Sequence, residues 1–107
     1  MPKRDDIKKL ISQYIKSISQ KIPINKVILF GSYATGNPNK YSDIDLAVIS
    51  SKFSEKTHLK DLKLLWTEAA KINSKIEPLP FSTEETKNTD SRSFLGNILK
   101  NGKVVYK

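Results

Sequence analysis

Residues 27–49, VILFGSYATGNPNKYSDIDLAVI, contain two apolar runs separated by a polar segment with two glycines. The first run, residues 27–30, is unbroken and ends at a glycine, which is typical of a strand buried on both faces. The second run, residues 44–49, predicts another strand. Residues 31–36 between them predict one or two turns of helix, and residues 37–39, Asn-Pro-Asn, predict a turn.

Apolar residues recur at helical spacing in three segments outside this stretch. They predict helices over residues 7–22, 59–72 and 94–99. The first helix precedes a proline, and Gly102 supplies the C-terminal stop of the last. Residues 82–85, Ser-Thr-Glu-Glu, have the pattern of a capping box, which marks a helix start.

Two further strands are expected in the C-terminal half of the chain. Residues 75–79 predict a strand that ends at Pro78 and Pro80, and proline places such a strand at a sheet edge. Residues 104–106 predict a short final strand. The alternation of helices and strands indicates an α/β (α+β) fold in which helices pack against a small sheet.

The composition limits what kind of protein this is. A chain of 107 residues and 12.1 kDa is expected to form a single domain, residues 1–107. It has no cysteine, no signal-like start and no apolar run long enough for a membrane span, so we expect a cytoplasmic protein without a disulfide framework.

The charge is basic, with 19 Lys and Arg against 11 Asp and Glu. Such a surplus attracts phosphates and acidic partners. All of these basic residues except Arg4 and Arg92 are lysines, and they are scattered along the chain. Because base-reading sites favour arginine forks, we do not expect dedicated nucleic-acid binding.

Gly31 and Ser32 follow the first strand and precede the expected helical turn. A residue without Cβ lets an anion approach the backbone closely, and the first N–H groups of a helix point outward. A serine hydroxyl adds a donor, so the pair predicts a triphosphate cradle. The stretch is not a Walker A loop, because Asn37 and Pro38 stand where that motif requires Lys and Ser or Thr.

Asp43 and Asp45 lie two residues apart at the second strand. Residues at this spacing on a strand point to the same face, so both carboxylates project together. Paired carboxylates repel each other unless cations or protons neutralise them, and their oxygens suit Mg²⁺ bound together with substrate phosphates. A carboxylate pair beside a phosphate cradle therefore predicts metal-assisted nucleotidyl transfer.

Gly31-Ser32, ten intervening residues and then Asp43-Ile44-Asp45 resemble the signature of the polymerase-β-like nucleotidyltransferase superfamily, and especially of the minimal nucleotidyltransferases. The resemblance implies a mixed sheet flanked by helices, Asp43 and Asp45 as Mg²⁺ ligands, and Gly31 and Ser32 as ligands of the nucleotide phosphates. It also implies a third carboxylate, as metal ligand or base. Glu77 is the only acidic residue of the third expected strand.

The same resemblance implies an activity and a partner. It predicts transfer of AMP from ATP to a hydroxyl group. Because minimal nucleotidyltransferases are commonly encoded with a HEPN-domain protein, often an RNase toxin, this chain would be the antitoxin and would modify a tyrosine of that partner. A homo- or hetero-oligomer is therefore expected.

Two alternatives stay open. Many relatives carry arginine near the Gly-Ser helix where this chain has Tyr33 and Thr35, although Lys40 is a candidate for the missing charge. One alternative is therefore an antitoxin that binds nucleotide with weak or no turnover and neutralises its partner by complex formation. The other is a transferase acting on a small molecule such as an aminoglycoside.

Overall fold

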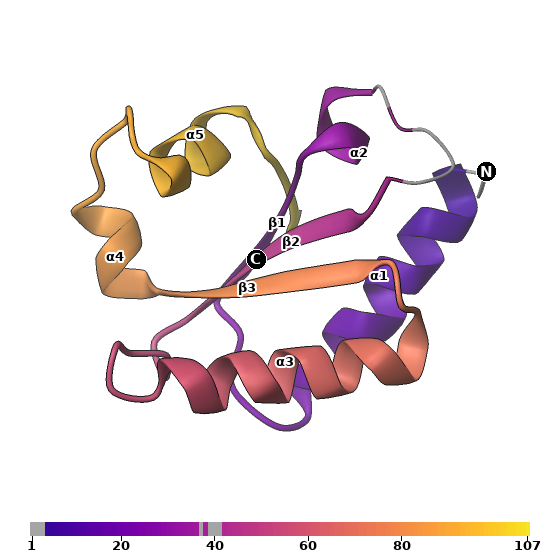
Figure 1. Cartoon of the computed structure of the whole chain (residues 1–107), viewed down its shortest axis with the longest axis horizontal. Coiled ribbons are helices and arrows are strands. Elements are labelled where there is room, and N and C mark those ends of the chain that lie inside the picture. Colours follow the sequence, from indigo (N-terminus) through magenta and orange to yellow (C-terminus); the bar gives the residue numbers. More distant parts are fainter. Residues whose placement is uncertain (1–3, 37, 39–41) are drawn as a thin grey trace.

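The computed structural model describes residues 4–36, 38 and 42–107. These residues form five helices and four strands, in an order that alternates except near the C-terminus (Figure 1). The elements are α1 (Arg4–Ser19), β1 (Lys26–Phe30), α2 (Ser32–Thr35), β2 (Ile44–Ser50), α3 (His58–Ile72), β3 (Ile76–Ser82), α4 (Thr83–Lys87), α5 (Phe94–Asn101) and β4 (Lys103–Tyr106).

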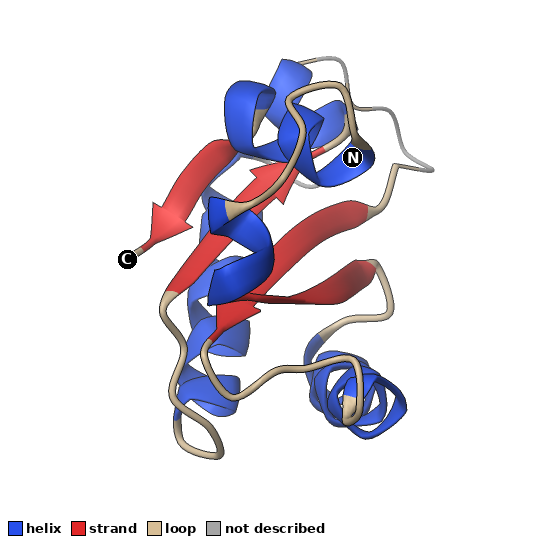
Figure 2. Cartoon of the chain, turned by 90° about the vertical axis from the view of Figure 1, so that its left-hand side faces the viewer, coloured by secondary structure: helices blue, strands red, loops and turns tan. Residues whose placement is uncertain are grey.

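The four strands form one mixed sheet in the order β3-β2-β1-β4 (Figure 2). β1 pairs antiparallel with β2 and with β4, whereas β2 and β3 are parallel. The parallel pair is joined by α3, which supplies the crossover that parallel strands require. The predicted small sheet flanked by helices is confirmed.

One face of the sheet is covered by α1 and α3. The side chains of Ile44, Leu46 and Val48 point to this face and belong to the main core cluster, together with apolar residues of both helices. The Tyr14 hydroxyl in α1 donates a hydrogen bond of 2.9 Å to the backbone carbonyl of Leu65 in α3. The hydroxyl of this fully buried tyrosine is thus satisfied while its ring fills the core.

The opposite face carries α5. Here Ile28, Ala47 and Ile49 pack with Ile98 in a second, smaller cluster. In Figure 1, α5 lies on the side of the strands opposite to α3. The smaller cluster covers only part of this face, and the candidate site described below lies on the part that it leaves uncovered.

The third strand differs from the prediction. Pro78 and Pro80 do not end β3, which continues to Ser82 in parallel register with β2. The strand is at the sheet edge, as predicted, and an edge strand tolerates proline where the missing N–H would face away from its neighbour. The backbone carbonyl of Pro78 accepts a 3.0 Å hydrogen bond from the indole N–H of Trp66.

The C-terminal helices also differ in part. The capping box at Ser82 is confirmed, with Glu85 N–H donating to the serine hydroxyl, but it begins a separate short helix, α4. Gly102 follows α5 as predicted, yet its φ of −75° is not left-handed. A side chain there would overlap Ile28, which explains the glycine. The predicted turn at residues 37–39 lies largely outside the described residues.

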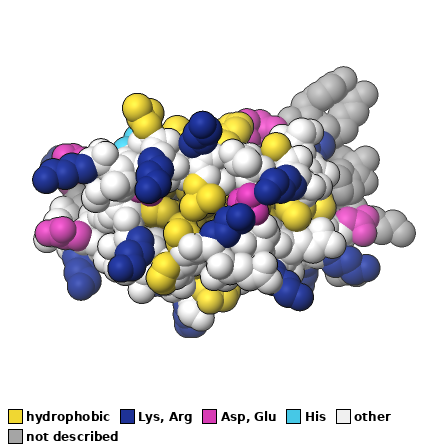
Figure 3. Space-filling view, turned by 90° about the horizontal axis from the view of Figure 1, so that it is seen from below, with side chains coloured by type: hydrophobic (Ala, Val, Ile, Leu, Met, Phe, Trp, Pro, Cys, Tyr) yellow, Lys and Arg dark blue, Asp and Glu magenta, His cyan; other side chains and the backbone are white. Residues whose placement is uncertain are grey.

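Figure 3 views the molecule from the side on which α3 lies. On this face Lys and Arg side chains are separated by apolar, acidic and neutral groups. The scattered lysines of the sequence thus form no continuous basic block on this face. None of the helices in the described part of the chain is both long and apolar enough to cross a bilayer.

Candidate functional site

Three carboxylates meet at one end of the sheet, on the side of α5. Asp45 is in register with Phe30 of β1 on one side and with Glu77 of β3 on the other. Asp43 directly precedes β2 and interacts electrostatically with both Asp45 and Glu77. The fold therefore brings together the three acidic residues that were singled out in the sequence.

Burial and neighbouring negative charge raise the pKa of two of these carboxyl groups, Asp45 and Glu77. The pKa of Asp45 is raised, first by burial and then by the charge of Asp43, although a hydrogen bond with Glu77 opposes the shift. The pKa of Glu77 is raised by burial, by the charges of Asp43 and Asp45, and by hydrogen bonds with both. A bound cation would relieve this repulsion.

Gly31 lies at the turn between β1 and α2, against Asp45. Its φ of 76° and ψ of −154° belong to a region that only glycine occupies readily. A Cβ at this position would also overlap the carboxylate oxygen Oδ2 of Asp45. Glycine is therefore required twice, once by the backbone and once by the neighbouring carboxylate.

Backbone hydrogen bonds within α2 leave the N–H groups of its first two residues without a partner in the helix. The N–H groups of Ala34 and Thr35 donate to the carbonyl of Gly31 at 3.0 and 3.1 Å, and the Gly36 N–H donates to Ser32. The N–H groups of Ser32 and Tyr33 begin the helix, so helix geometry gives them no acceptor within it. Because Gly31 lies against Asp45, the predicted phosphate cradle adjoins the carboxylates.

The donor chemistry of this cluster suits Mg²⁺, which prefers carboxylate oxygens. Among residues 4–36, 38 and 42–107, however, no group of three or more His, Cys, Asp or Glu side chains could hold a metal ion by itself. Mg²⁺ commonly binds through one or two carboxylates plus substrate phosphates. Asp43 and Asp45 fit that mode, in which the nucleotide completes the coordination.

Tyr33 and Thr35, which the sequence analysis singled out, both make contacts within the fold. Tyr33 packs against the main core cluster, and its hydroxyl is buried without a hydrogen-bond partner among the described residues. Its ring packs into the fold and is thus not presented for stacking on a nucleotide. The Thr35 hydroxyl donates to the Ser32 carbonyl at 3.2 Å. Lys40 lies outside the described residues.

Sequence reasoning missed a hollow of about 390 Å³ beside Gly31. It opens between α2 and α5, and its lining includes Thr35, Arg92, Phe94 and Asn97. Arg92 and Phe94 are some sixty residues from Gly31 in the chain, and no local pattern connects them. The sequence counted Phe94 in the apolar pattern of the last helix, and only the structure shows that its ring is exposed.

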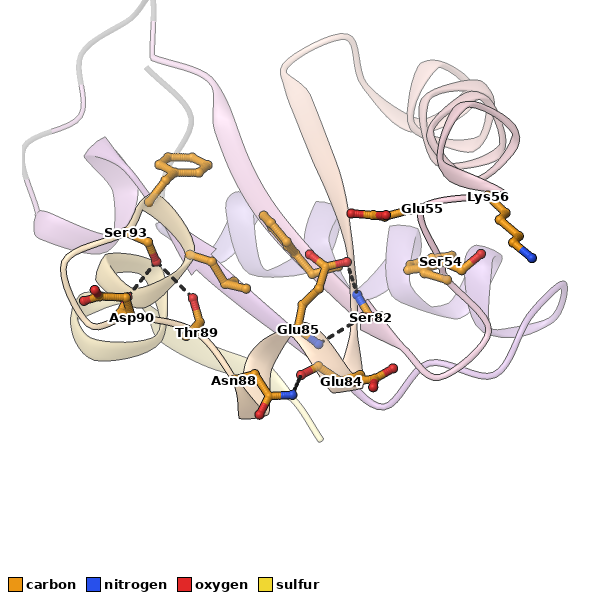
Figure 4. Close-up of a pocket in the computed structure, with 14 residues that line it drawn as sticks. Ser54, Glu55, Lys56, Ser82, Glu84, Glu85, Asn88, Thr89, Asp90 and Ser93 are labelled. Atoms are coloured by element: carbon orange, nitrogen blue, oxygen red, sulfur yellow. Dashed lines mark hydrogen bonds between the residues drawn. The ribbon is translucent and has the colours of Figure 1, made fainter.

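A larger hollow, of about 860 Å³, lies farther along the same face (Figure 4). It is bordered by the loop before α3, by α4 and by the segment leading into α5. Phe81 lines it, four residues after Glu77 on β3, which places it roughly 13 Å from the carboxylates. Phe94 lines both hollows, so the two adjoin at this ring.

Comparisons with known proteins agree with this geometry. Residues 12–107 match the family model described as polymerase beta, nucleotidyltransferase. A protein of Methanocaldococcus jannaschii, MJ0604, named as a candidate protein adenylyltransferase, is 33% identical over 102 residues, which span 92% of this chain and 96% of that protein.

Solved structures are similar in fold. A candidate nucleotidyltransferase from Sulfolobus solfataricus superimposes with a TM-score of 0.67 at 17% identity, over 92% of this chain and 78% of that one. A toxin–antitoxin structure with AMP-PNP gives 0.56 at 20% identity, and a toxin–antitoxin MntA-HpeT mutant with two Asp-to-Glu changes gives 0.55 at 18%. Both cover 92% of this chain and 72% of the other.

The family match covers most of the chain, including the Gly-Ser turn, both aspartates and Glu77. The M. jannaschii relative matches nearly end to end. This chain therefore belongs to the polymerase β-type nucleotidyltransferase family.

Proposed function

We propose that this nucleotidyltransferase moves AMP from ATP to a hydroxyl group of a protein, in a Mg²⁺-dependent reaction. The acceptor in this proposal is a tyrosine of a HEPN-domain toxin, for which the chain is the antitoxin. The observation that carries the proposal is the contact of Gly31 with Asp45, in register with Glu77. It places the turn that we propose to bind phosphate beside the carboxylate cluster.

Each residue has a role in this reaction. Asp43 and Asp45 hold Mg²⁺, while the backbone of Gly31 and the hydroxyl and N–H of Ser32 hold the β- and γ-phosphates. Bound Mg²⁺ would neutralise charge on the triphosphate and on the departing pyrophosphate. Glu77, beside both aspartates, is the third carboxylate, as a metal ligand or as the base for the acceptor.

The bond changes are those of a nucleotidyl transfer. The acceptor oxygen attacks the α-phosphorus, the bond between that phosphorus and the bridging oxygen of the β-phosphate breaks, and pyrophosphate leaves. The hydroxyl proton passes to Glu77 or to solvent. The protein's contribution is mainly positioning and charge stabilisation, as is general for phosphoryl chemistry.

The relatives support the finer parts of the proposal. The M. jannaschii protein is named for transfer of adenylyl groups to proteins, and two of the similar structures are toxin–antitoxin proteins, one with an ATP analogue. The other carries paired Asp-to-Glu changes two positions apart, the spacing of Asp43 and Asp45. A toxin partner and ATP are therefore the first acceptor and donor to test.

The test is label transfer with the chain, a HEPN-domain partner, Mg²⁺ and ATP labelled at the α-phosphate. We expect label on the partner, and loss of that label with Asp43→Asn or Asp45→Asn. Asp61→Asn is the matched control, because Asp61 accepts a hydrogen bond from Thr57 at the start of α3 and an amide oxygen can replace it. Transfer that persists in Asp45→Asn contradicts the proposal.

A second candidate is an antitoxin that binds nucleotide without turnover. One observation favours it: Tyr33 and Thr35 supply no positive charge at the turn. The same experiment separates the candidates if toxin activity is followed in parallel. Neutralised toxin with no transferred label supports complex formation alone.

A further inference from the structure

The hollow between α2 and α5 begins where the proposed phosphate site ends. Gly31 and Thr35 line its α2 side, and Phe94, Asn97 and Asn101 line its α5 side. Its volume of about 390 Å³ is within the range of small-ligand pockets. Gly31 borders the hollow and also lies against Asp45, so this one residue separates a group bound in the hollow from the carboxylates.

Phe94 presents an aromatic ring to this hollow. It is 61% exposed, unusually high for phenylalanine, although its neighbour Leu95 is buried. The ring meets Phe30 edge to face, with centroids 5.7 Å apart and planes at 83°. Ser93 caps α5 through the Gly96 N–H and so fixes the first turn that carries Phe94. An exposed ring held in place in this way is a platform for stacking a planar group.

Asn97 and Asn101 offer a defined pair of polar groups one turn apart on α5. The Asn101 amide nitrogen donates to the Asn97 carbonyl oxygen at 3.0 Å. This bond uses the oxygen of Asn97 and one N–H of Asn101, so Asn97 keeps its NH₂ as a donor and Asn101 keeps its oxygen as an acceptor. Adenine and cytosine both present the complement, an amino donor beside a ring-nitrogen acceptor, and the two-ring adenine has the larger face to stack on Phe94. Guanine and uracil present the opposite order, with an oxo group beside an N–H.

We propose that this hollow is the nucleobase pocket, in which Phe94 stacks on adenine while Asn97 and Asn101 pair with its amino edge. The proposal rests on the proposed function, which names ATP, and adds to it the residues that hold and select the base. It also explains why an apolar ring stays exposed next to Gly31. The triphosphate then extends from the hollow across Gly31 to the carboxylates.

The experiment is calorimetry on the full chain with Mg²⁺ and five ligands: ATP, CTP, GTP, UTP and inorganic tripolyphosphate, which has no base. The wild type is expected to bind ATP best. Phe94→Ala is expected to weaken ATP roughly 10-fold or more while changing tripolyphosphate less than about twofold. Phe94→Tyr restores ATP affinity, and Leu59→Ala, which removes another exposed apolar side chain outside the hollow, changes neither ligand.

Asn97→Asp tests the edge contact. It replaces the donor NH₂ by an acceptor oxygen, so ATP affinity falls while GTP affinity falls less or rises. Equal affinity of the wild type for all four nucleotides, or equal loss of ATP and tripolyphosphate in Phe94→Ala at an unchanged melting temperature, overturns the base pocket and leaves the phosphate site standing. If the wild type binds no nucleotide and no tripolyphosphate, the proposed function fails as well.

Discussion

Gly31 and Asp45 are so close that a side chain at position 31 would occupy the place of the Asp45 carboxylate oxygen Oδ2. Gly31 directly follows β1, and Asp45 lies on the antiparallel neighbour β2, opposite Phe30, the last residue of β1. The turn that is proposed to hold phosphate and the carboxylate that is proposed to hold metal are therefore one packed unit. A substitution at either residue should therefore shift the position of the other.

Gly31→Ala should lower both stability and Mg²⁺-dependent ATP binding. The backbone conformation costs a non-glycine residue on the order of 1–3 kcal/mol, and the methyl group displaces Asp45 in addition. Gly36→Ala is the control: its φ is also positive, at 82°, but nothing lies within 4 Å of an added Cβ. Urea unfolding and ATP titration of both variants make the comparison. Equal ATP affinities would contradict the coupling.

Asp45→Asn and Glu77→Gln should each stabilise the metal-free protein. The pKa of each carboxyl is raised in the fold, so ionisation is less favourable in the folded than in the unfolded chain. The stability of the wild type in EDTA should therefore increase as pH falls toward the ordinary carboxyl pKa. The check is thermal melting in EDTA at neutral pH, where either variant melting below the wild type would contradict the assignment.

Replacing Glu68 should destabilise the protein, in contrast to the substitutions of Asp45 and Glu77. It is 3% exposed between α3 and α1, with Lys71 at 2.9 Å and Ser17 at 2.8 Å, and these hydrogen bonds lower its pKa. The stability that ionised Glu68 adds is present above the unfolded-state pKa and is lost as pH falls through the folded-state pKa. Glu68→Gln should cost about 1–3 kcal/mol near neutrality and less in acid.

Urea unfolding at neutral and acidic pH measures this difference. Asp90→Asn is the control, because Asp90 also has a lowered pKa but its ion pair with Arg92 is exposed. We expect no measurable change from that substitution. A penalty for Glu68→Gln that does not shrink in acid would contradict the role of the charge.

The packing of α3 can be tested with two leucines of the same helix. Leu65 is fully buried in the main core cluster, whereas Leu59 is 80% exposed. Leu65→Ala should destabilise the fold by about 2–5 kcal/mol, and Leu59→Ala by less than about 0.5 kcal/mol. Chemical denaturation of the two variants checks this. Similar penalties would mean that α3 is rotated from the orientation described.

Much of the fold was predictable because its elements have strong local signals. The unbroken run in β1, the apolar residues of β2 and the stripe of α3 each identified an element. The length of β3 was not predictable. Pro78 and Pro80 are usual strand breakers, and only pairing with β2 on one side makes them acceptable.

The site was predictable as far as its residues lie close in sequence. Gly31, Ser32, Asp43 and Asp45 form a recognisable spacing, and Glu77 follows from the strand that carries it. The hollow beside Gly31 was not predictable, because β4 and the cap of α5 bring residues 92–102 back to β1 only in the folded chain. Contacts between residues so far apart in the chain produce no periodic pattern in the sequence.

The most direct test of the central claim is calorimetric titration of ATP into the wild-type chain, first with Mg²⁺ and then with EDTA in its place. The carboxylate pair and the Gly-Ser turn together predict saturable binding with Mg²⁺, a large loss of affinity in EDTA, and the same loss in Asp43→Asn and Asp45→Asn with Mg²⁺ present. Binding that is unaffected by removing the metal or either aspartate, or no binding at all, would contradict it.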